Sequence, residues 1–183
     1  NAKVLFLQEN VGSAPKKDVG IMSRALGVYP VRINSSLVTA QLRDRYYWSN
    51  IRTKSDGLFG DIVTDIPEPK DRKILLKDII TNGSVDKDKH TCLMEGYIRK
   101  SIFDTDQESW ERYIKKRVKN TGTTTLIYTE QDRVRLVNKI EMCRLQGFPD
   151  DWCDILSDAQ SCSLLGDGWT LPIIEHIFGE ING

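Results

Sequence analysis

The sequence predicts an α/β fold that is interrupted by an irregular insertion. A strand–helix–strand pattern opens the chain, short apolar pieces separated by prolines and charged turns fill residues 52–104, and helical spacing returns from residue 138. Alternating strands and helices favour an open α/β sheet, whereas the middle region follows no regular period. The chain has 183 residues, 39% hydrophobic and 28% charged, which suffices for a globular core without metals or disulfides.

The opening pattern forms one β-α-β unit. Lys3–Gln8 contains a continuous apolar run, which predicts a strand buried on both faces, as in a parallel sheet. Polar residues beginning with Glu9 follow it, at the strand end where open α/β sheets hold their ligands. Asp18–Leu26 has apolar residues at helical spacing and a glycine after it, and Val31–Asn34 is expected to be the next strand.

The later elements are predicted from composition and capping signals. Arg45–Ile51 is rich in aromatic residues and reads as a strand. Residues 52–104 suggest an irregular inserted subdomain. Thr105–Lys119 begins with a capping box and carries one apolar stripe, so it is expected to be a helix. Further helices, expected to return to the first sheet, are predicted around residues 138–147, 159–165 and 172–178.

Charge is balanced overall but unevenly distributed. There are 26 basic and 26 acidic side chains, which argues against a uniformly basic nucleic-acid binder. Residues 1–50 carry 7 basic and 3 acidic side chains, residues 51–140 carry 18 and 15, and residues 141–183 carry 1 and 8. This distribution predicts a positive face on the first two thirds of the chain and an acidic C-terminal segment turned elsewhere.

Membrane, disulfide and metal sites are not expected. The longest apolar runs fall far short of the roughly twenty residues that a membrane helix needs, so an intracellular, cytoplasmic protein is predicted. Two isolated histidines, His90 and His176, lack metal-like partners. The chain starts at Asn1, directly before a strand-like run, which suggests a trimmed fragment or an incomplete chain. The widely spaced cysteines are expected to be reduced packing residues; they are Cys92, Cys143, Cys153 and Cys162.

Four short segments, in this order and with a long variable stretch after the second, carry a family resemblance. They are Phe6–Val11, Thr39–Trp48, Glu141–Pro149 and Leu165–Pro172. The set resembles the sixth, eighth, ninth and tenth motifs of the DNA cytosine-5 methyltransferases, most closely the branch of the animal de novo enzymes. The resemblance implies the C-terminal part of a Rossmann-like, S-adenosylmethionine-dependent methyltransferase domain with an inserted target-recognition domain, acting on double-stranded DNA.

The resemblance implies a catalytic role for Glu9, Arg43 and Arg45. Such enzymes add a cysteine thiolate to cytosine C6, and the negative charge that builds toward N3 needs a donor. Glu9 is expected to be that acid, reading a base flipped out of the duplex. Two arginines two residues apart on an extended segment point to the same face, where a guanidinium can hold a base oxygen or a phosphate and orient Glu9. The alternatives are a strand-end glutamate and exposed arginines paired with Asp44; the aromatic residues that follow are expected in the core.

The last motif is expected beside the cofactor. Asp167, Gly168 and Trp169 lie where the family binds S-adenosylmethionine, since small residues permit close backbone approach and an indole can cover the cofactor. Many members carry asparagine where Asp167 stands, and a plain turn with Trp169 in the core is the alternative. Arg144–Pro149 is expected to organise the recognition subdomain, and Ile140 replaces an arginine common in bacterial members.

The insertion is expected to recognise DNA. The predicted boundaries are 1–51 for the C-terminal part of the catalytic sheet, 52–137 for the target-recognition domain and 138–183 for the returning helices. A basic cluster ends the helix at 105–119, and phosphate contact or complementing of the helix dipole both explain it. Its residues are Lys115, Lys116, Arg117 and Lys119.

Two family features are missing from the sequence. None of the six prolines is followed by cysteine, so the Pro-Cys nucleophile is absent, and so is the glycine-rich loop that opens the cofactor site. The chain is therefore expected to be inactive alone, and to need an N-terminal half from a bacterial or phage methyltransferase that is supplied upstream or as a separate subunit. The alternatives are a non-catalytic DNA-binding module and an unrelated α/β domain with coincidental motifs.

Overall fold

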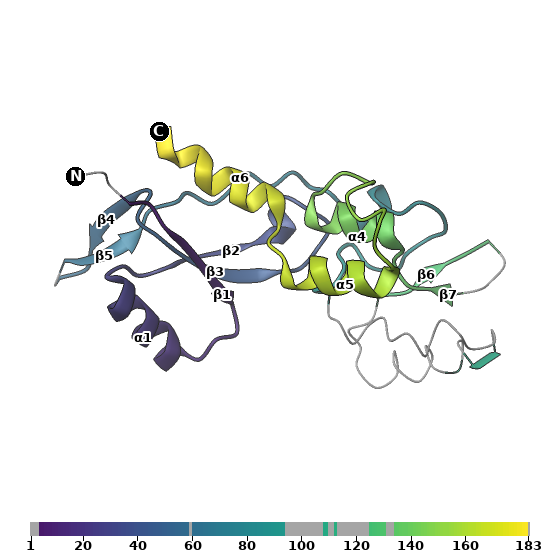
Figure 1. Cartoon of the computed structure of the whole chain (residues 1–183), viewed down its shortest axis with the longest axis horizontal. Coiled ribbons are helices and arrows are strands. Elements are labelled where there is room, and N and C mark those ends of the chain that lie inside the picture. Colours follow the sequence, from purple (N-terminus) through teal and green to yellow (C-terminus); the bar gives the residue numbers. More distant parts are fainter. Residues whose placement is uncertain are drawn as a thin grey trace.

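The computed structural model describes residues 4–58, 60–93, 108–109, 112, 125–130 and 134–182. A three-stranded sheet lies in one half of an elongated molecule, and the C-terminal helices α4 and α5 lie in the other half (Figure 1). The strands β1 (Leu7–Val11), β2 (Val31–Asn34) and β3 (Asp44–Ser49) have the order β1-β3-β2. β3 runs antiparallel to both neighbours, so β1 and β2 are parallel to each other with β3 between them.

The first strand begins later than the apolar run predicts. Val4 and Leu5 precede β1 and are 79% and 39% exposed, whereas Glu9 lies inside the strand and pairs with Tyr47. The reason is that β3 ends at Ser49, and beyond it the side chain of Asn50 takes over: it accepts from the Phe6 amide (2.9 Å) and donates to the Val4 carbonyl (2.9 Å). The expectation of a strand over Lys3–Gln8, buried on both faces, was therefore wrong in extent and in burial.

The crossover helix and the second strand are where the sequence places them. Helix α1 (Lys16–Leu26) ends at Gly27, which adopts the left-handed conformation at φ 71° that caps many helices. Ser23, the buried residue of α1, accepts a 2.9 Å hydrogen bond from the indole of Trp48. This bond ties the helix to β3.

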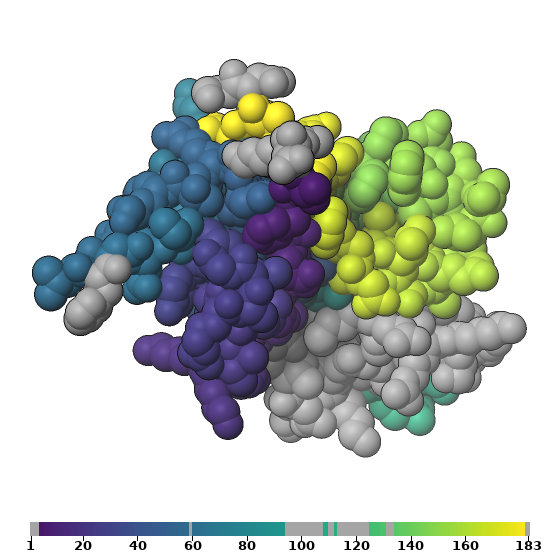
Figure 2. Space-filling model, turned by 60° about the vertical axis from the view of Figure 1, so that its left-hand side comes forward, coloured from purple at the N-terminus to yellow at the C-terminus, as the bar shows by residue number. Residues whose placement is uncertain are grey.

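The strand buried on both faces is β3. Tyr47 and Trp48 are 2% and 0% exposed, and because successive side chains of a strand point to opposite faces, they serve different cores. Trp48 faces α1, whereas Tyr47 packs with α6 (Leu171–Gly179), which crosses the other face of the sheet. Leu7 of β1 packs against the same cluster, and α6 lies beside the start of the chain (Figure 2). The prediction that the aromatic residues of this strand serve the core is confirmed for these two.

A hairpin follows the sheet. It consists of β4 (Thr53–Asp56) and β5 (Asp61–Thr64), and the Ser49 amide donates to the Thr64 hydroxyl at 3.0 Å. Ile66, just after the hairpin, packs with the α6 cluster. Residues 53–66 therefore pack with the sheet, although they lie within the predicted boundaries of the insertion.

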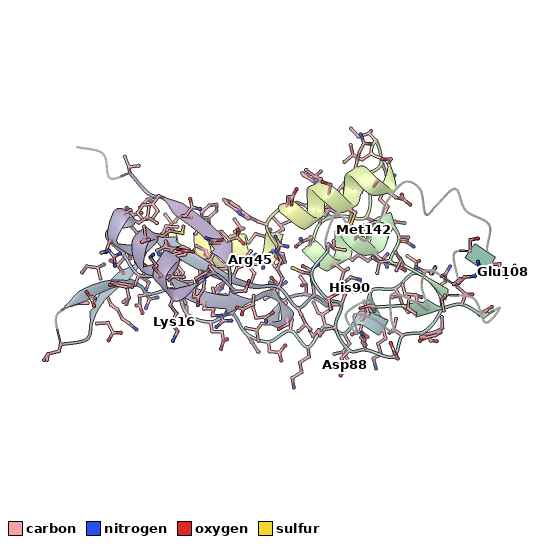
Figure 3. The ribbon with its side chains drawn as sticks, turned by 90° about the horizontal axis from the view of Figure 1, so that it is seen from below. Lys16, Arg45, Asp88, His90, Glu108 and Met142 are labelled. Carbon is pink, nitrogen blue, oxygen red and sulfur yellow. The ribbon has the colours of Figure 1, made fainter. Side chains whose placement is uncertain are left out.

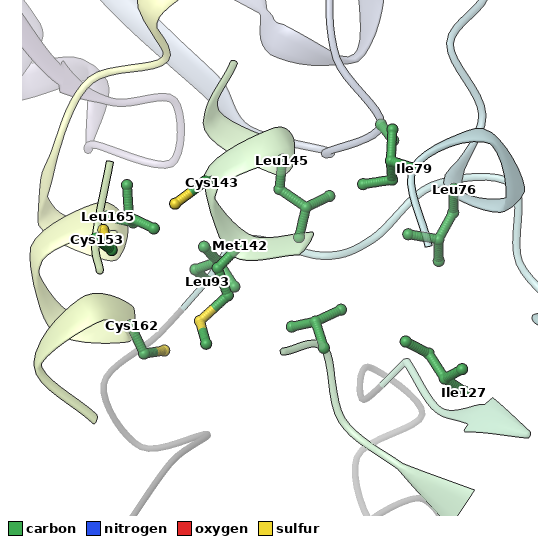
Figure 4. Packing of buried hydrophobic residues seen from close by; sticks show 12 residues of the cluster. Leu76, Ile79, Leu93, Ile127, Met142, Cys143, Leu145, Cys153, Cys162 and Leu165 are labelled. Atoms are coloured by element: carbon green, nitrogen blue, oxygen red, sulfur yellow. The ribbon is translucent and has the colours of Figure 1, made fainter. Parts of the chain in front are cut away.

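The second core joins the insertion to α4 (Lys139–Gln146) and α5 (Asp158–Asp167). Met142, Cys143 and Leu145 of α4 are fully buried with Leu76 and Ile127 of the inserted region (Figure 4). The 3₁₀ turn η2 (Leu76–Asp78) and the two-residue strands β6 (Ile127–Tyr128) and β7 (Val134–Arg135) contribute to this region, while 3₁₀ turns η1 (Ser35–Leu37) and η4 (Glu180–Asn182) flank β2 and α6. Of the three C-terminal helices, α6 returns to the sheet as expected, whereas α4 and α5 pack in this second core.

Two sets of polar contacts, one around Lys89 and one around Glu141, hold the insertion in place. The Nζ atom of Lys89 donates to the carbonyls of Ser36 (2.6 Å), Thr39 (3.0 Å) and Ile74 (2.6 Å), which joins the insertion to the turn after β2. Glu141, at the first turn of α4 and 0% exposed, pairs with Arg135 at 2.8 Å. Both sets of contacts provide partners for backbone or charged groups that burial would otherwise leave unpaired.

Candidate active site

A cavity of about 570 Å³ opens where β1 ends and β3 begins. The parallel strands β1 and β2 both have their carboxyl ends at this edge of the sheet, which is where open α/β sheets hold ligands. The end of α5 and one loop of the insertion complete the wall. The lining residues are Val11, Gly12, Ser13, Arg32, Leu42, Asp44, Arg45, Cys92, Leu93, Gly166 and Asp167.

Close packing of the backbone shapes the cavity floor. The Gly12 amide donates to the Asp44 carbonyl at 2.9 Å, just beyond the last ladder pair of β1 and β3. A Cβ atom at Gly12 would lie 2.7 Å from Cγ of Asp44 and 2.8 Å from its carbonyl oxygen. A side chain at this position would therefore push the two strand ends apart.

Glu9 and Arg45 form an ion pair beside the cavity. Glu9 faces Tyr47 and Arg45 faces Val11 in the strand register, so the two side chains are diagonal neighbours on one face. The distance from Arg45 Nε to Glu9 Oε1 is 2.6 Å, and the side chains are 13% and 18% exposed. Arg45 lies between the sheet and the α4 region (Figure 3). Among the described residues no N–H or O–H is aligned to donate a hydrogen bond to this buried oxygen, so its contact with Arg45 is an ion pair without a hydrogen bond.

The adjacent tyrosine is a neutral neighbour of this pair. Burial raises the pKa of the Tyr47 phenol, and the Glu9 carboxylate raises that pKa further. The phenol therefore keeps its proton at neutral pH. Tyr47 adds no charge to the site, lies opposite Glu9 in the strand register and packs against α6.

Arg43 points to the same side but has different partners. It is 4% exposed, and its Nη1 and Nη2 atoms donate to the carbonyls of Gly166 (2.9 Å) and Gly168 (2.7 Å). The prediction that both arginines point to one side agrees with the contacts, since each guanidinium approaches Sγ of Cys92, at 3.4 Å for Arg43 and 3.6 Å for Arg45. The structure thus brings Glu9, Arg43 and Arg45 together, with Arg45 on the cavity and Arg43 behind its wall.

Cys92 is a site residue that the sequence analysis missed, because it was expected to be a packing residue like the other cysteines. Cys143, Cys153 and Cys162 are buried and form no disulfide, whereas Cys92 is half-buried and lines the cavity. Backbone pairing across the chain places it there: the His90 amide donates to Ala40 (2.8 Å), and the Leu42 amide donates to His90 (2.7 Å). No local pattern signals this contact, which joins segments about fifty positions apart.

A second missed feature is the Arg32–Asp44 pair at the cavity rim. Nε of Arg32 donates to Oδ1 and Oδ2 of Asp44 at 3.0 and 2.8 Å, and the guanidinium also lies over the Tyr46 ring, 5.5 Å from its centroid. The pairing expected as an alternative for Asp44, with the two motif arginines, is therefore made by Arg32 instead. These side chains project from the sheet face opposite to Glu9.

The three residues of the last motif lie at the end of α5. Asp167 lines the cavity, and Trp169 is 41% exposed, so the alternative of a core tryptophan does not hold. Gly168 follows the helix, and a Cβ atom there would lie 2.9 Å from the Leu164 carbonyl oxygen. The turn thus presents a carboxylate and an indole on a backbone with no room for a further side chain.

The structure describes only some of the residues predicted to bind DNA or to organise the recognition region. Lys115, Lys116, Arg117 and Lys119, and most of the helix expected over 105–119, lie outside the described residues. Arg144 donates to Asp150 and to the Ile79 carbonyl (2.9 Å), which is consistent with an architectural role. Ile140 is 37% exposed. None of the described helices is long and apolar enough to cross a membrane.

The chain is similar to known methyltransferases. At 26% identity over 198 residues, the chain resembles the type II methyltransferase M1.ScrFI of Lactococcus lactis subsp. cremoris, covering 94% of this chain and 50% of that protein. A second relative, the type II methyltransferase M.SsoII of Shigella sonnei, is 24% identical over 165 residues, with coverages of 90% and 42%. The chain spans about half the length of these relatives.

The fold is shared with a solved methyltransferase, and the sequence matches a family profile. The crystal structure of the S. pombe Dnmt2 methyltransferase superposes with a TM-score of 0.53 at 14% identity, covering 97% of this chain and 66% of that one. The profile of the C-5 cytosine-specific DNA methylases matches residues 33–183. That match takes in β3 and the end of α5, which both line the cavity, together with α4 and α6, and the chain therefore belongs to the C-5 cytosine-specific DNA methylase family.

Proposed function

We propose that this chain provides the base pocket, the recognition region and the closing helices of a DNA cytosine-5 methyltransferase. The observation that carries the proposal is the Glu9–Arg45 ion pair beside a cavity of about 570 Å³ in a chain of this family. A carboxyl group and a guanidinium together match the N3 and O2 edge of a cytosine that has left the duplex.

In this proposal Glu9 shares a proton with N3 of the base. Addition of a thiolate to C6 pushes charge toward N3, and a proton held between the carboxyl group and N3 neutralises it. Arg45 holds the carboxylate by the ion pair, with Nε 2.6 Å from Oε1. Among the described residues its terminal nitrogens make one Nη1 donation to the Asp44 carbonyl and the Nη2 approach to Cys92, which leaves on each nitrogen an N–H that can reach a base oxygen.

The methyl donor of this family is S-adenosylmethionine, which supplies an electrophilic methyl group when bound. The end of α5 fits one wall of its site: Asp167 faces the cavity with a carboxylate that can accept from an amine or hydroxyl, and the exposed Trp169 indole can cover an aromatic ring. Asp167 and Trp169 would hold the donor in this chain, and the glycine-rich loop of the family would provide the remaining contacts from outside it.

The nucleophilic thiolate is proposed to come from a Pro-Cys segment that these residues do not contain. It lies either upstream in the same polypeptide or in a second subunit, and with it the protein acts on double-stranded DNA. Phosphate contact is proposed for the basic cluster at residues 115–119, within a target-recognition region spanning 52–137.

Reconstitution tests the proposal. The chain is combined with an N-terminal half that carries the Pro-Cys and glycine-rich segments, and tritiated methyl transfer to duplex DNA is measured. We expect transfer by the assembled pair, none by this chain alone, and none when the Pro-Cys cysteine of the added half is replaced by alanine. A stable assembly that binds DNA and transfers no methyl group would favour the non-catalytic binding module instead.

A further inference from the structure

Arg43 is buried behind the cavity wall, and its guanidinium binds the end of α5. The side chain is 4% exposed, and it donates to the Gly166 carbonyl (2.9 Å) from Nη1 and to the Gly168 carbonyl (2.7 Å) from Nη2. Arg43 is not among the residues that line the cavity, whereas Gly166 and Asp167 are. The guanidinium therefore supports the cavity wall by hydrogen bonds without lining the cavity itself.

The partial negative charge at the C-terminal end of α5 explains why the Arg43 guanidinium lies beside it. The last carbonyls of a helix carry partial negative charge and have no partner within the helix. Helix α5 has no basic residue in its own last turn. Arg43 provides the missing charge from another segment, and two separate nitrogens of its planar fork each donate to one carbonyl, a fixed geometry that the one nitrogen of a lysine does not reproduce.

A second, buried chain of hydrogen bonds joins the same two segments. The Ser35 amide donates to the Arg43 carbonyl (2.9 Å), and the single hydrogen of Ser35 Oγ is shared between that carbonyl (3.1 Å) and Thr170 Oγ1 (3.0 Å). The Thr170 hydroxyl in turn donates to Oε1 of Gln146 at 2.8 Å, and the Gln146 amide donates to the Leu165 carbonyl. The turn from α5 to α6 is thus held on both sides of Trp169.

These contacts connect the residues proposed to hold the base with the residues proposed to hold the methyl donor. Arg45, which pairs with Glu9, is two residues after Arg43. The turn to which Arg43 donates its hydrogen bonds carries Asp167 and Trp169. We propose that Arg43 is a positioning residue: it does not touch the base but sets the α5–α6 turn, and with it the methyl donor, at a fixed distance from the base pocket. This inference rests on the proposed function, and it changes the role that the family resemblance implies for Arg43.

Two reactions separate this role from contact with the base. Release of tritium from C5-tritiated cytosine needs only thiolate addition to C6, protonation of C5 by solvent, loss of the tritium ion and departure of the thiolate, so it proceeds without a methyl donor. Methyl transfer needs the donor at the correct distance from C5. A residue that positions the donor affects the second reaction and spares the first, whereas a base contact affects both.

The experiment compares Arg43→Lys with Arg45→Lys in the complete enzyme on duplex DNA, with the affinity for S-adenosylmethionine measured by calorimetry. For Arg43→Lys we expect methyl transfer to fall roughly 10- to 100-fold, because small misplacements cost that much, together with weaker donor binding and tritium release within about threefold of wild type. For Arg45→Lys we expect both reactions to fall in parallel.

Thr170→Val is the second variant, since it removes the other link without touching the base side or the charge. It should lower methyl transfer and donor affinity in the same pattern as Arg43→Lys, and it keeps the test valid if Arg43→Lys does not fold. Loss of tritium release in Arg43→Lys equal to that of Arg45→Lys, or normal donor affinity in a folded Thr170→Val enzyme, would overturn the assignment. A wild-type assembly with neither reaction would overturn the proposed function itself.

Discussion

At the scale of single residues, the proposed mechanism depends on Glu9. In the complete enzyme, Glu9→Gln should reduce turnover strongly while DNA affinity stays within about threefold, because the proton shared with N3 matters most in the transition state. Methyl-transfer kinetics and fluorescence anisotropy with duplex DNA measure the two quantities. Parallel loss of binding and turnover would show instead that Glu9 acts by holding Arg45 in place.

The four thiols should differ sharply in reactivity. Cys92 is half-buried on the cavity, whereas the other three cysteines are buried, and burial together with the neighbouring Cys153 raises the pKa of Cys143. A thiol reagent should therefore titrate one cysteine rapidly in the native chain and the rest after unfolding. Cys92→Ser is the control, and it should abolish the rapid phase. A rapid phase that survives in this variant would contradict the placement of Cys92.

At the scale of elements, the Glu141 cluster should couple stability to pH. Burial alone would raise the pKa of Glu141, but hydrogen bonds from Arg135, Thr81 and Asn138 outweigh it, and the net pKa lies below the ordinary value. A carboxyl group with a lowered folded-state pKa stabilises the fold above its unfolded pKa, near 4.3, and this contribution is lost as the pH falls through the folded pKa.

Glu141→Gln should therefore lower the free energy of unfolding at pH 7 by about 2–3 kcal/mol, the usual worth of hydrogen bonds to a charged group. The difference from wild type should shrink as the pH falls below about 4. Urea unfolding at several pH values measures it. Glu68→Gln, at an exposed position, is the matched control and should show no such difference.

The ends of two helices offer a matched pair of glycine substitutions. Gly27 and Gly147 cap α1 and α4 at φ 71° and 79°, a region that costs other residues roughly 1–2 kcal/mol. A Cβ atom at Gly27 meets nothing within 4 Å, whereas at Gly147 it would clash with the ring of Pro172 at the start of α6. Gly147→Ala should lower the melting temperature clearly more than Gly27→Ala. Equal shifts would show that α6 can move away from α4.

At the scale of the whole molecule, binding to DNA should depend steeply on salt. Each phosphate contact contributes about 0.9 to the slope of log affinity against log salt. Replacing Lys115, Lys116, Arg117 and Lys119 by alanine should flatten the slope by up to that amount per lost contact, as followed by anisotropy. Lys54→Ala is the control, because Lys54 is already paired with Asp65 at 3.0 Å. An unchanged slope in the fourfold variant would favour the helix-dipole explanation for these residues.

The molecule also shows what local sequence could not reveal. The strand β3 was predicted because its aromatic residues favour strands, but its central place between β1 and β2 was not, since strand order depends on pairing between distant segments. The apolar start of the chain was misread for the same reason: Val4 and Leu5 resemble a strand, yet β3 has already ended opposite them.

The sequence by itself determined the local features: the end of α1 at Gly27 and the four ordered motifs that resemble those of the methyltransferase family. Only the tertiary structure decided which side chains meet. It paired Glu9 with Arg45, placed Cys92 between two guanidinium groups and directed Arg43 to the carbonyls of α5. The physical reason is range, because caps and periodicity act over a few residues, whereas these contacts join segments tens of positions apart that only the packed core brings together.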